Sequence, residues 1–340
     1  MKQGQLTRCL PSSMFMDLKD VSEGLLKGRT LGVVKYTTEC VAPTATGGYP
    51  ELSIHMTNSA DDGFAEVWAT DQPVESGEHN GIAYAHDGEY LLCTGHIAPA
   101  REYSGGTRSA YTSALELMDS LGYRQSFRMW NFVNQINGYN ARGLEIYRDF
   151  CQGRAEAFEQ FSFDEAELPA ATGIGSLGGG IAFYFLACRS DRVTPIENSR
   201  QIAAYRYPKR YGPKPPKFAR ATHLSSLDAV DHRAQLYVSG TASIRGHETL
   251  FRGDVEKQCH LALDNIAHVI GTENLSTYEI SAGNHLSDLR NIKVYVRHRE
   301  DIEQVRKICL ETFPATVDIA FMNVDICRSD LLVEIEGIVP

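Results

Sequence analysis

The sequence predicts an α+β protein in which one β-α-β-α-β-β unit occurs twice. Residues 234–340 show this order most clearly, because two segments with helical apolar spacing alternate with runs of β-branched and aromatic residues. Residues 81–188 repeat the order. The interval between corresponding strands is 147 residues, from Tyr90 to Tyr237. Two unrelated α+β domains would show the same periodicity, so pattern alone leaves that alternative open.

Each element of the first copy follows from its apolar pattern. Helices show apolar residues three and four positions apart, and strands show short apolar or alternating runs. The last strand, IAFYFLAC, is the most strongly β-prone of them. The predicted elements are strands at 81–86 and 89–95, a helix at 107–121, a strand at 127–133, a helix at 144–161 and a strand at 181–188.

The second copy is predicted by the same criteria. Its first strand ends at Gly240, as the corresponding strand of the first copy ends at Gly95. Its second helix has Asp and Glu in the first turn, where the helix dipole favours negative charge. The predicted elements are a strand at 234–240, a helix at 253–270, a strand at 289–297, a helix at 301–313 and strands at 315–324 and 331–338.

Length and composition narrow the class of protein. The chain has 340 residues, 43% of them apolar, and a net charge of −10, which disfavours nucleic-acid binding. We find no apolar run long enough for a membrane helix and no secretion signal at the N-terminus. Eight cysteines without a C-x-x-C pair then predict reduced thiols in the cytoplasm. We expect an N-terminal unit at 1–200, a connecting segment at 201–230 and a C-terminal unit at 231–340.

The connecting segment has an unusual composition. Residues 206–220, RYPKRYGPKPPKFAR, contain six basic residues, three aromatics and four prolines, and no acid. One interpretation is a solvated linker. The other is a stiff loop that recognises an anion in a cleft between the two units, since a stiff loop loses little entropy on binding.

A glycine-rich segment formally matches a nucleotide-binding motif. Gly173 to Gly178 fits G-x-G-x-x-G, but a β-prone run follows where the dinucleotide fold requires a helix. We therefore interpret it as a glycine turn that permits close backbone approach. The eleven histidines show no zinc-ligand spacing. We expect neither a cofactor nor a metal.

Two carboxylates on the last predicted strand are candidates for acid catalysis. Glu334 and Glu336 are two residues apart and share one face of an apolar strand. A buried carboxyl is either paired with a cation or neutral with a raised pKa, and a neutral carboxyl is a suitable general acid. Cys327, seven residues upstream, is either a core residue or part of the site.

One predicted helix carries a candidate anion clamp. Tyr147 and Arg154 lie about two turns apart on the helix at 144–161 and so share a face. An arginine among apolar neighbours can bind a carboxylate with two parallel hydrogen bonds. It can equally extend its charge to solvent along its apolar stem.

The C-terminal half resembles the RidA/YjgF family, whose chorismate-mutase-like units each combine a sheet with helices. The resemblance lies in Tyr237-Val-Ser-Gly240, in residues 253–258, in Ala262-Leu-Asp-Asn and in Val333-Glu-Ile-Glu-Gly. That family forms trimers with pockets between neighbouring units. Its carboxylate-binding arginine would stand at Thr316, which puts imine deaminase activity in doubt and requires another anion ligand.

The whole chain resembles the chorismatases, which carry two such units. The most specific segments are Arg128-Met-Trp-Asn-Phe, residues 147–155 and residues 168–175. Chorismatases remove pyruvate from chorismate. One subfamily hydrolyses it to a dihydroxycyclohexadiene carboxylate (the diene-diol), and another makes 3-hydroxybenzoate, a starter unit for bacterial polyketide-type products. Gly240 with Cys327 resembles the second type, and Glu334 matches the family's catalytic acid.

The resemblance also implies how the substrate is held. Chorismate has two carboxylates, and the candidate clamps are Arg154 with Tyr147, and Tyr207, Arg210 and Tyr211 of the connecting segment. Which clamp takes which carboxylate stays open. We expect a monomer with the site between its halves, no nucleic-acid or membrane partner and chorismate as the ligand. The alternatives are the hydrolytic reaction, an imine deaminase or a non-catalytic module that binds an aromatic acid.

Overall fold

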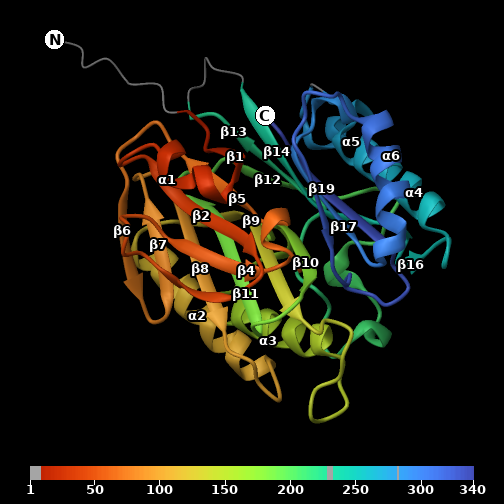
Figure 1. Cartoon of the computed structure of the whole chain (residues 1–340), viewed down its shortest axis with the longest axis horizontal. Coiled ribbons are helices and arrows are strands. Elements are labelled where there is room, and N and C mark those ends of the chain that lie inside the picture. The colour runs from red at the N-terminus through yellow and green to blue at the C-terminus, as the bar shows by residue number, and fades with distance from the viewer. Residues whose placement is uncertain (1–8, 228–232, 282) are drawn as a thin grey trace.

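The computed structural model describes residues 9–227, 233–281 and 283–340. Parts of the predicted segments 1–200, 201–230 and 231–340 lie outside these described residues. Three β-sheets share one apolar core, and long helices cover the outer faces of two of them (Figure 1). No helix within the described ranges is both long and apolar enough to cross a membrane.

The middle sheet contains the first predicted copy of the unit. Its strand order is β10-β9-β11-β8-β7-β6, with β9 and β10 parallel and β11 inserted antiparallel between β8 and β9. Helices α2 and α3 pack together beneath it (Figure 1). The elements are β6 (Glu75–His79), β7 (Ile82–His86), β8 (Tyr90–Ile97), α2 (Ser104–Ser120), β9 (Gln125–Asn134), α3 (Ile146–Gln160), β10 (Ala170–Ser176) and β11 (Ile181–Cys188).

The C-terminal sheet has the same topology, which confirms the predicted repeat, although β10, the counterpart of β18, was not among the strands predicted for the first copy. Its order is β12-β13-β14-β19-β17-β18, with β17 and β18 parallel and β19 inserted antiparallel between β14 and β17. The elements are β12 (Val193–Ile196), β13 (Ala221–Ser225), β14 (Ala234–Ala242), α4 (Val255–Ile270), α5 (Thr272–Leu275), β17 (Arg290–Val296), α6 (Ile302–Thr312), β18 (Ile319–Asn323) and β19 (Val333–Val339). After β14, the short strands β15 (Ile244–Arg245) and β16 (Glu248–Thr249) form a separate two-stranded sheet.

The boundary of this sheet differs from the expected one at residue 231. Strands β12 and β13 already belong to it, so it begins at Val193. The basic, proline-rich segment is therefore a long connection between two adjacent strands of one sheet, and it does not link two units. Proline accounts for this, because it supplies no N–H to a sheet and interrupts regular pairing over residues 197–220.

The sequence did not predict the third sheet. Its order is β1-β5-β2-β4-β3, and β1, β5, β2 and β4 repeat the pairing of β14, β19, β17 and β18. It is thus the strand core of a third unit. Among the described residues it carries short helices in place of long ones: the one-turn α1 (Val21–Gly24) and the 3-10 turns Leu18–Asp20 and Ala60–Asp62. The elements are β1 (Ser12–Asp17), β2 (Thr30–Thr37), β3 (Val41–Thr44), β4 (Glu51–His55) and β5 (Phe64–Ala69).

Equivalent positions in the three sheets differ in one informative way. The corresponding strand pairs are β2 with β5, β9 with β11, and β17 with β19. At one level of each pair an aromatic residue of the first strand lies opposite a residue of the second, in the pairs Tyr36–Phe64, Trp130–Tyr184 and Tyr295–Glu334. The first two pairs are stacked rings with centroids 4.5 and 4.4 Å apart. Only the third has a carboxyl at this level. The repeat therefore fills two of its three equivalent positions with aromatic packing and places Glu334 in the third.

Four buried charged residues join the three sheets at their centre, and we call them the central ion cluster: Glu66, Arg128, Lys293 and Glu336. Arg128 Nη2 lies 2.5 Å from Glu336 Oε2, and Lys293 Nζ lies 2.8 Å from Glu66 Oε2 and 3.1 Å from Glu336 Oε1. Each of these side chains is at most 2% exposed. Two cations thus balance two anions in a site without water access.

Breaking this balance is expected to destabilise the fold. Arg128→Met removes one cation from buried Glu336, and losing one partner of a buried pair costs about 3–5 kcal/mol. Urea denaturation measures the free energy of unfolding. Arg306→Met is the matched control, because Arg306 forms an ion pair with Glu303 at the surface and such pairs contribute at most about 1 kcal/mol. Equal effects of the two substitutions would contradict a structural role for the cluster.

Candidate active site

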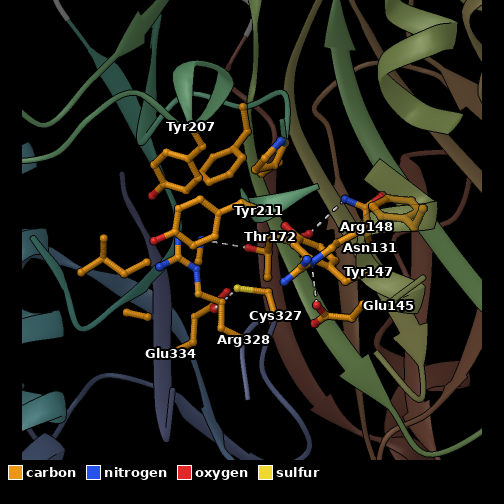
Figure 2. A pocket seen from close by; sticks show the side chains of 18 of the residues that line it. Asn131, Glu145, Tyr147, Arg148, Thr172, Tyr207, Tyr211, Cys327, Arg328 and Glu334 are labelled. Carbon is orange, nitrogen blue, oxygen red and sulfur yellow. Dashed lines mark hydrogen bonds and ion pairs between the residues drawn. The ribbon is translucent and has the colours of Figure 1, made fainter. Parts of the chain in front are cut away.

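A cavity of about 220 Å³ lies between the middle and C-terminal sheets. Strand β10 and helix α3 line one side, and β14 and β19 line the other. The proline-rich connection and residues 327–330 complete the wall. Figure 2 shows Tyr147 and Glu145 facing Glu334 and Cys327 across this space, with Tyr207 and Tyr211 beside them. The cavity thus lies between two units, where the sequence analysis expects the site.

Glu334 is a neutral acid in the wall of the cavity. Its side chain comes from β19, and the residue is 3% exposed. Burial is the main cause that raises the pKa of Glu334, to about 8, and the nearby charge of Glu336 adds to it. Arg128 and Arg220 oppose the shift but do not cancel it. Glu334 therefore holds its proton at neutral pH.

Glu336 has the opposite character on the same strand face. Burial opposes its ionisation, but Lys293 and Arg128 outweigh burial and hold the pKa of Glu336 below its ordinary value. It also accepts hydrogen bonds from Trp130 Nε1 at 2.8 Å and Tyr295 Oη at 3.1 Å. A buried carboxyl is either paired with a cation or protonated. Glu336 is the paired one and Glu334 is the protonated one.

Gly240 allows the Glu334 carboxyl to occupy its position. A β-carbon at residue 240 would overlap Glu334 Oε1 and lie 3.2 Å from Thr172 Cγ2. The Gly240 N–H donates to Thr172 Oγ1 at 3.0 Å, and Thr172 in turn donates to Glu336. Glycine is thus required at position 240 because β14 passes close to the Glu334 carboxyl.

Cys327 lies directly beside the acid. Its Sγ donates to Glu334 Oε2 at 3.9 Å, as the dashed line in Figure 2 marks. Burial raises the pKa of the Cys327 thiol well above its usual range, and Glu334 adds to the shift. The thiol is therefore protonated at neutral pH and is available as a weak hydrogen-bond donor rather than as a nucleophile.

The glycine-rich segment brings Cys327 to the site. Residues 173–176 lie on strand β10, and strand β11 follows instead of a helix, so the dinucleotide motif has no structural basis here. A β-carbon at Gly175 would lie 2.7 Å from the backbone oxygen of Asp325, and the Gly175 N–H donates to that oxygen at 2.7 Å. The predicted close approach is present, although in a strand and not in a turn.

Arg154 is a buried cation that faces the cavity. It is 4% exposed and its guanidinium packs over Phe158, 4.8 Å from the ring centre. Its Nε has no hydrogen-bond partner, and in the described part of the chain it forms no ion pair with a carboxylate. Tyr147 also lines the cavity, so the helix face predicted to carry both residues points into it. A buried, unpaired cation is costly unless a ligand neutralises it.

The proline-rich connection supplies a second group of polar side chains. Tyr207 accepts a hydrogen bond from Arg220 Nη2 at 2.7 Å, and Tyr211 donates to the backbone oxygen of His247 at 2.7 Å. The guanidinium of Arg328 stacks on Tyr211, 4.2 Å from the ring centre. These four side chains line the cavity, which favours the anion-recognition interpretation over a solvated linker.

Comparison with known proteins agrees with this geometry. Residues 66–187 match the family described as chorismatase FkbO/Hyg5-like, N-terminal, and residues 217–340 match the family described as endoribonuclease L-PSP. The chain is 57% identical to the 3-hydroxybenzoate synthase of Streptomyces hygroscopicus over 91% of both chains. It is 48% identical to a chorismatase of Streptomyces rapamycinicus over 91% of this chain and 92% of that one. The chain belongs to the chorismatase family.

A solved chorismatase structure extends the comparison to the whole fold. It is 42% identical in sequence, covers 98% of this chain and 100% of its own, and superimposes with a TM-score of 0.93. The match of residues 217–340, together with the shared topology of the two large sheets, confirms the RidA/YjgF-like fold predicted for the C-terminal unit. Thr316, where the RidA/YjgF family has its arginine, is exposed and does not line the cavity.

Arg210 was expected to bind a carboxylate of the substrate, but the structure places it outside the cavity. It is exposed, pairs with Glu248 and packs on the ring of Tyr211, and it does not line the cavity. The cations of the site that sequence reasoning missed are Arg220 and Arg328. Arg220 ends the basic segment singled out in the sequence, but its position beside strand β13 directs it inward. Arg328 follows Cys327 and had no distinguishing signal.

Proposed function

We propose that this protein removes pyruvate from chorismate and releases 3-hydroxybenzoate. The observation that carries the proposal is a protonated, buried Glu334 in the same cavity as the buried, unpaired Arg154. A dianion that must be protonated on carbon needs both features. The name of the 57% identical relative, 3-hydroxybenzoate synthase, supports the same product.

We propose an assignment of the two carboxylates of chorismate from the positions of the arginines. The enolpyruvyl carboxylate is bonded to the carbon that carries the reacting methylene, so it must lie close to Glu334. Arg220 is one of the cations whose charge acts on Glu334, and we assign it this carboxylate together with Tyr207. Arg154 with Tyr147 then takes the ring carboxylate at the α3 side of the cavity. Such positioning contributes several kcal/mol to lowering the barrier.

The chemistry begins with a proton transfer from Glu334 to the enolpyruvyl methylene. The transfer forms a methyl group and an oxocarbenium ion, which makes pyruvate a good leaving group. The neighbouring ring hydroxyl then attacks the carbon that carries the ether, whose bond to oxygen breaks, and pyruvate leaves with the ether oxygen. The resulting arene oxide opens and loses a ring proton to give 3-hydroxybenzoate. No water is consumed, and Glu334 regains a proton for the next turnover.

Turnover of chorismate tests this function directly. Purified protein is incubated with chorismate, and pyruvate is measured enzymatically while the aromatic product is identified by NMR. We expect one 3-hydroxybenzoate for each pyruvate. Pyruvate accompanied by the diene-diol would support the hydrolytic reaction instead, and absence of turnover would refute the proposal.

Cys327 and Gly240 are expected to control the product. Cys327→Ala removes the thiol beside the acid and should divert part of the turnover to the diene-diol. Gly240→Ala adds a methyl group that overlaps Glu334 Oε1, so it should also lower kcat, by about tenfold, because the acid must move. Product ratios from chromatography measure the effect. Cys188→Ala, a buried thiol outside the cavity, is the control, and an unchanged ratio in Cys327→Ala would contradict the assignment.

We further propose a cytoplasmic monomer as the active form. Three sheets meet in one chain and the cavity is lined by residues of that chain, so the site needs no second copy. The eight free cysteines, five of them buried, suit a reducing compartment. Analytical ultracentrifugation at assay concentrations tests the oligomeric state, and activity that depends on formation of a dimer would contradict it.

A further inference from the structure

Glu197 lies directly behind the substrate cation Arg220 and makes no hydrogen bond with its side chain. Both of its carboxylate oxygens are buried and lack a partner in the described residues, and so does Arg220 Nε. The closest approach between the two groups is 3.8 Å, from Arg220 Nε to Glu197 Oε2. Glu197 does not line the cavity. Buried polar groups without hydrogen bonds are uncommon, and one at the border of a site calls for a physical explanation.

The backbone holds Glu197 in this place. It follows strand β12, its N–H donates to Tyr278 Oη at 2.8 Å, and its carbonyl accepts from Asn274 Nδ2 at 2.9 Å. Arg220 is held as well, because its Nη2 donates to Ile202 O at 3.0 Å and to Tyr207 Oη at 2.7 Å. The gap of 3.8 Å between the two side chains is thus set by the fold.

The charged and titratable groups around Glu197 are few. Arg220 faces it from the end of the connection, Arg206 and Tyr205 from the turn at 204–206, and Tyr278 from the turn after α5. Arg206 is already paired with Glu165, 2.8 Å away. Arg220 is therefore the cation that Glu197 shares with any anion in the cavity.

We propose that Glu197 is a positioning residue that competes with the substrate for Arg220, being ionised in part in the empty enzyme and protonated when the enolpyruvyl carboxylate is bound. This inference rests on the proposed function, since it takes chorismate as the ligand of Arg220. Two carboxylates cannot both be charged beside one guanidinium in a buried site without strong repulsion. Binding of chorismate to the ionised form then takes up one proton from solvent, and that proton goes to Glu197.

The pH range of the effect follows from the burial of the group. Burial raises the pKa of Glu197 to about 7, against the opposing charges of Arg220 and Arg206. Below this pH Glu197 is neutral and leaves the charge of Arg220 to the substrate. Above it, the ionised carboxylate weakens binding. We expect KM for chorismate to rise about fourfold from pH 6 to pH 7.5 while kcat stays nearly constant.

Three substitutions test this with steady-state kinetics over that range. Glu197→Gln should abolish the rise in KM, because the amide does not ionise, and Glu197→Asp should retain it. Glu256→Gln is the control, because Glu256 is an exposed carboxylate on α4 and is not among the charged groups that act on Glu197. A wild-type KM that does not change with pH, or a Glu197→Gln enzyme with the wild-type profile, would overturn the inference.

Calorimetry measures the proton itself. Chorismate is titrated at pH 7.5 into Glu334→Gln enzyme, which cannot turn it over, in phosphate and in Tris buffer. We expect uptake of roughly 0.7 proton per chorismate, lost in Glu334→Gln/Glu197→Gln. Binding without proton uptake would refute the role of Glu197 and leave the proposed function intact. Failure of the wild-type enzyme to convert chorismate would refute the function.

Discussion

Replacing Glu334 by glutamine is expected to lower kcat for pyruvate release by about a thousandfold, within the range for a lost general acid. Glutamine has nearly the same shape, so the fold and the cavity should persist. It cannot transfer a proton to the enolpyruvyl methylene. A coupled pyruvate assay measures the rate, and circular dichroism confirms the fold. Glu256→Gln, an exposed carboxylate on α4, should retain full activity. A Glu334→Gln enzyme with more than a tenth of the wild-type kcat would contradict the assignment.

The pH profile gives an independent test of the same acid. The protonated form of Glu334 is the active one, and its pKa is about 8 in the folded protein. The rate should therefore be retained below pH 8 and fall tenfold per pH unit well above it. Glu334→Asp, which keeps a carboxyl, should retain such a descending limb. An unchanged wild-type rate at pH 9.5 would exclude a neutral Glu334 as the proton donor.

Replacing Arg154 by methionine is expected to produce the second largest effect. The substitution removes the cation for the ring carboxylate and leaves that carboxylate unpaired in a buried site. Such a loss costs about 2–5 kcal/mol, so kcat/KM for chorismate should fall by about 30-fold or more. Stopped-assay kinetics over a wide range of chorismate concentration separates KM from kcat. Most of the change should appear in KM.

The stability of the same variant distinguishes binding from structure. Arg154 forms no ion pair with a carboxylate among the described residues and its Nε has no partner, so removing its charge should preserve or increase the free energy of unfolding. Arg128→Met, which breaks the central ion cluster, should do the opposite. If Arg154→Met lost stability as Arg128→Met does and kept its KM, Arg154 would be a structural residue.

The repeated unit could be predicted because its signal is strong and local. Long helices such as α2 and α4 have clear apolar spacing, and the same order of elements recurs around Tyr90 and Tyr237. The N-terminal sheet escaped prediction because its strands stand alone, without long helices between them. It resembles the other two sheets in its strand order, because β5 inserts between β1 and β2. Hydrogen bonding between strands that are distant in sequence leaves no periodic signal.

The site was predictable to the extent that its residues lie on regular elements. Tyr147 and Arg154 share a helix face and Glu334 lies on the regular strand β19, and these three side chains line the cavity. Within the connecting segment, spacing carries no such information. Arg210 and Arg220 look alike in the sequence, and only the path of the chain into β13 turns Arg220 inward.

Ion pairs between residues that are distant in sequence could not be predicted either. The sequence poses the question of which buried carboxyl is neutral but does not answer it, because the answer depends on Arg128 and Lys293. These residues lie 208 and 43 positions from Glu336 along the chain and reach it only through the meeting of the sheets. The pKa values of Glu334 and Glu336 differ because those two cations contact one carboxylate and not the other.

Turnover in water enriched in oxygen-18 tests the central claim most directly. The claim is that Glu334 initiates an internal displacement in a cavity shaped by Gly240 and Cys327. Mass spectrometry of the isolated aromatic product gives the origin of its hydroxyl oxygen. We expect 3-hydroxybenzoate without label in the hydroxyl group, because that oxygen comes from the ring hydroxyl of chorismate. Label in the hydroxyl group of 3-hydroxybenzoate would show that water attacks the ring and would contradict the internal route.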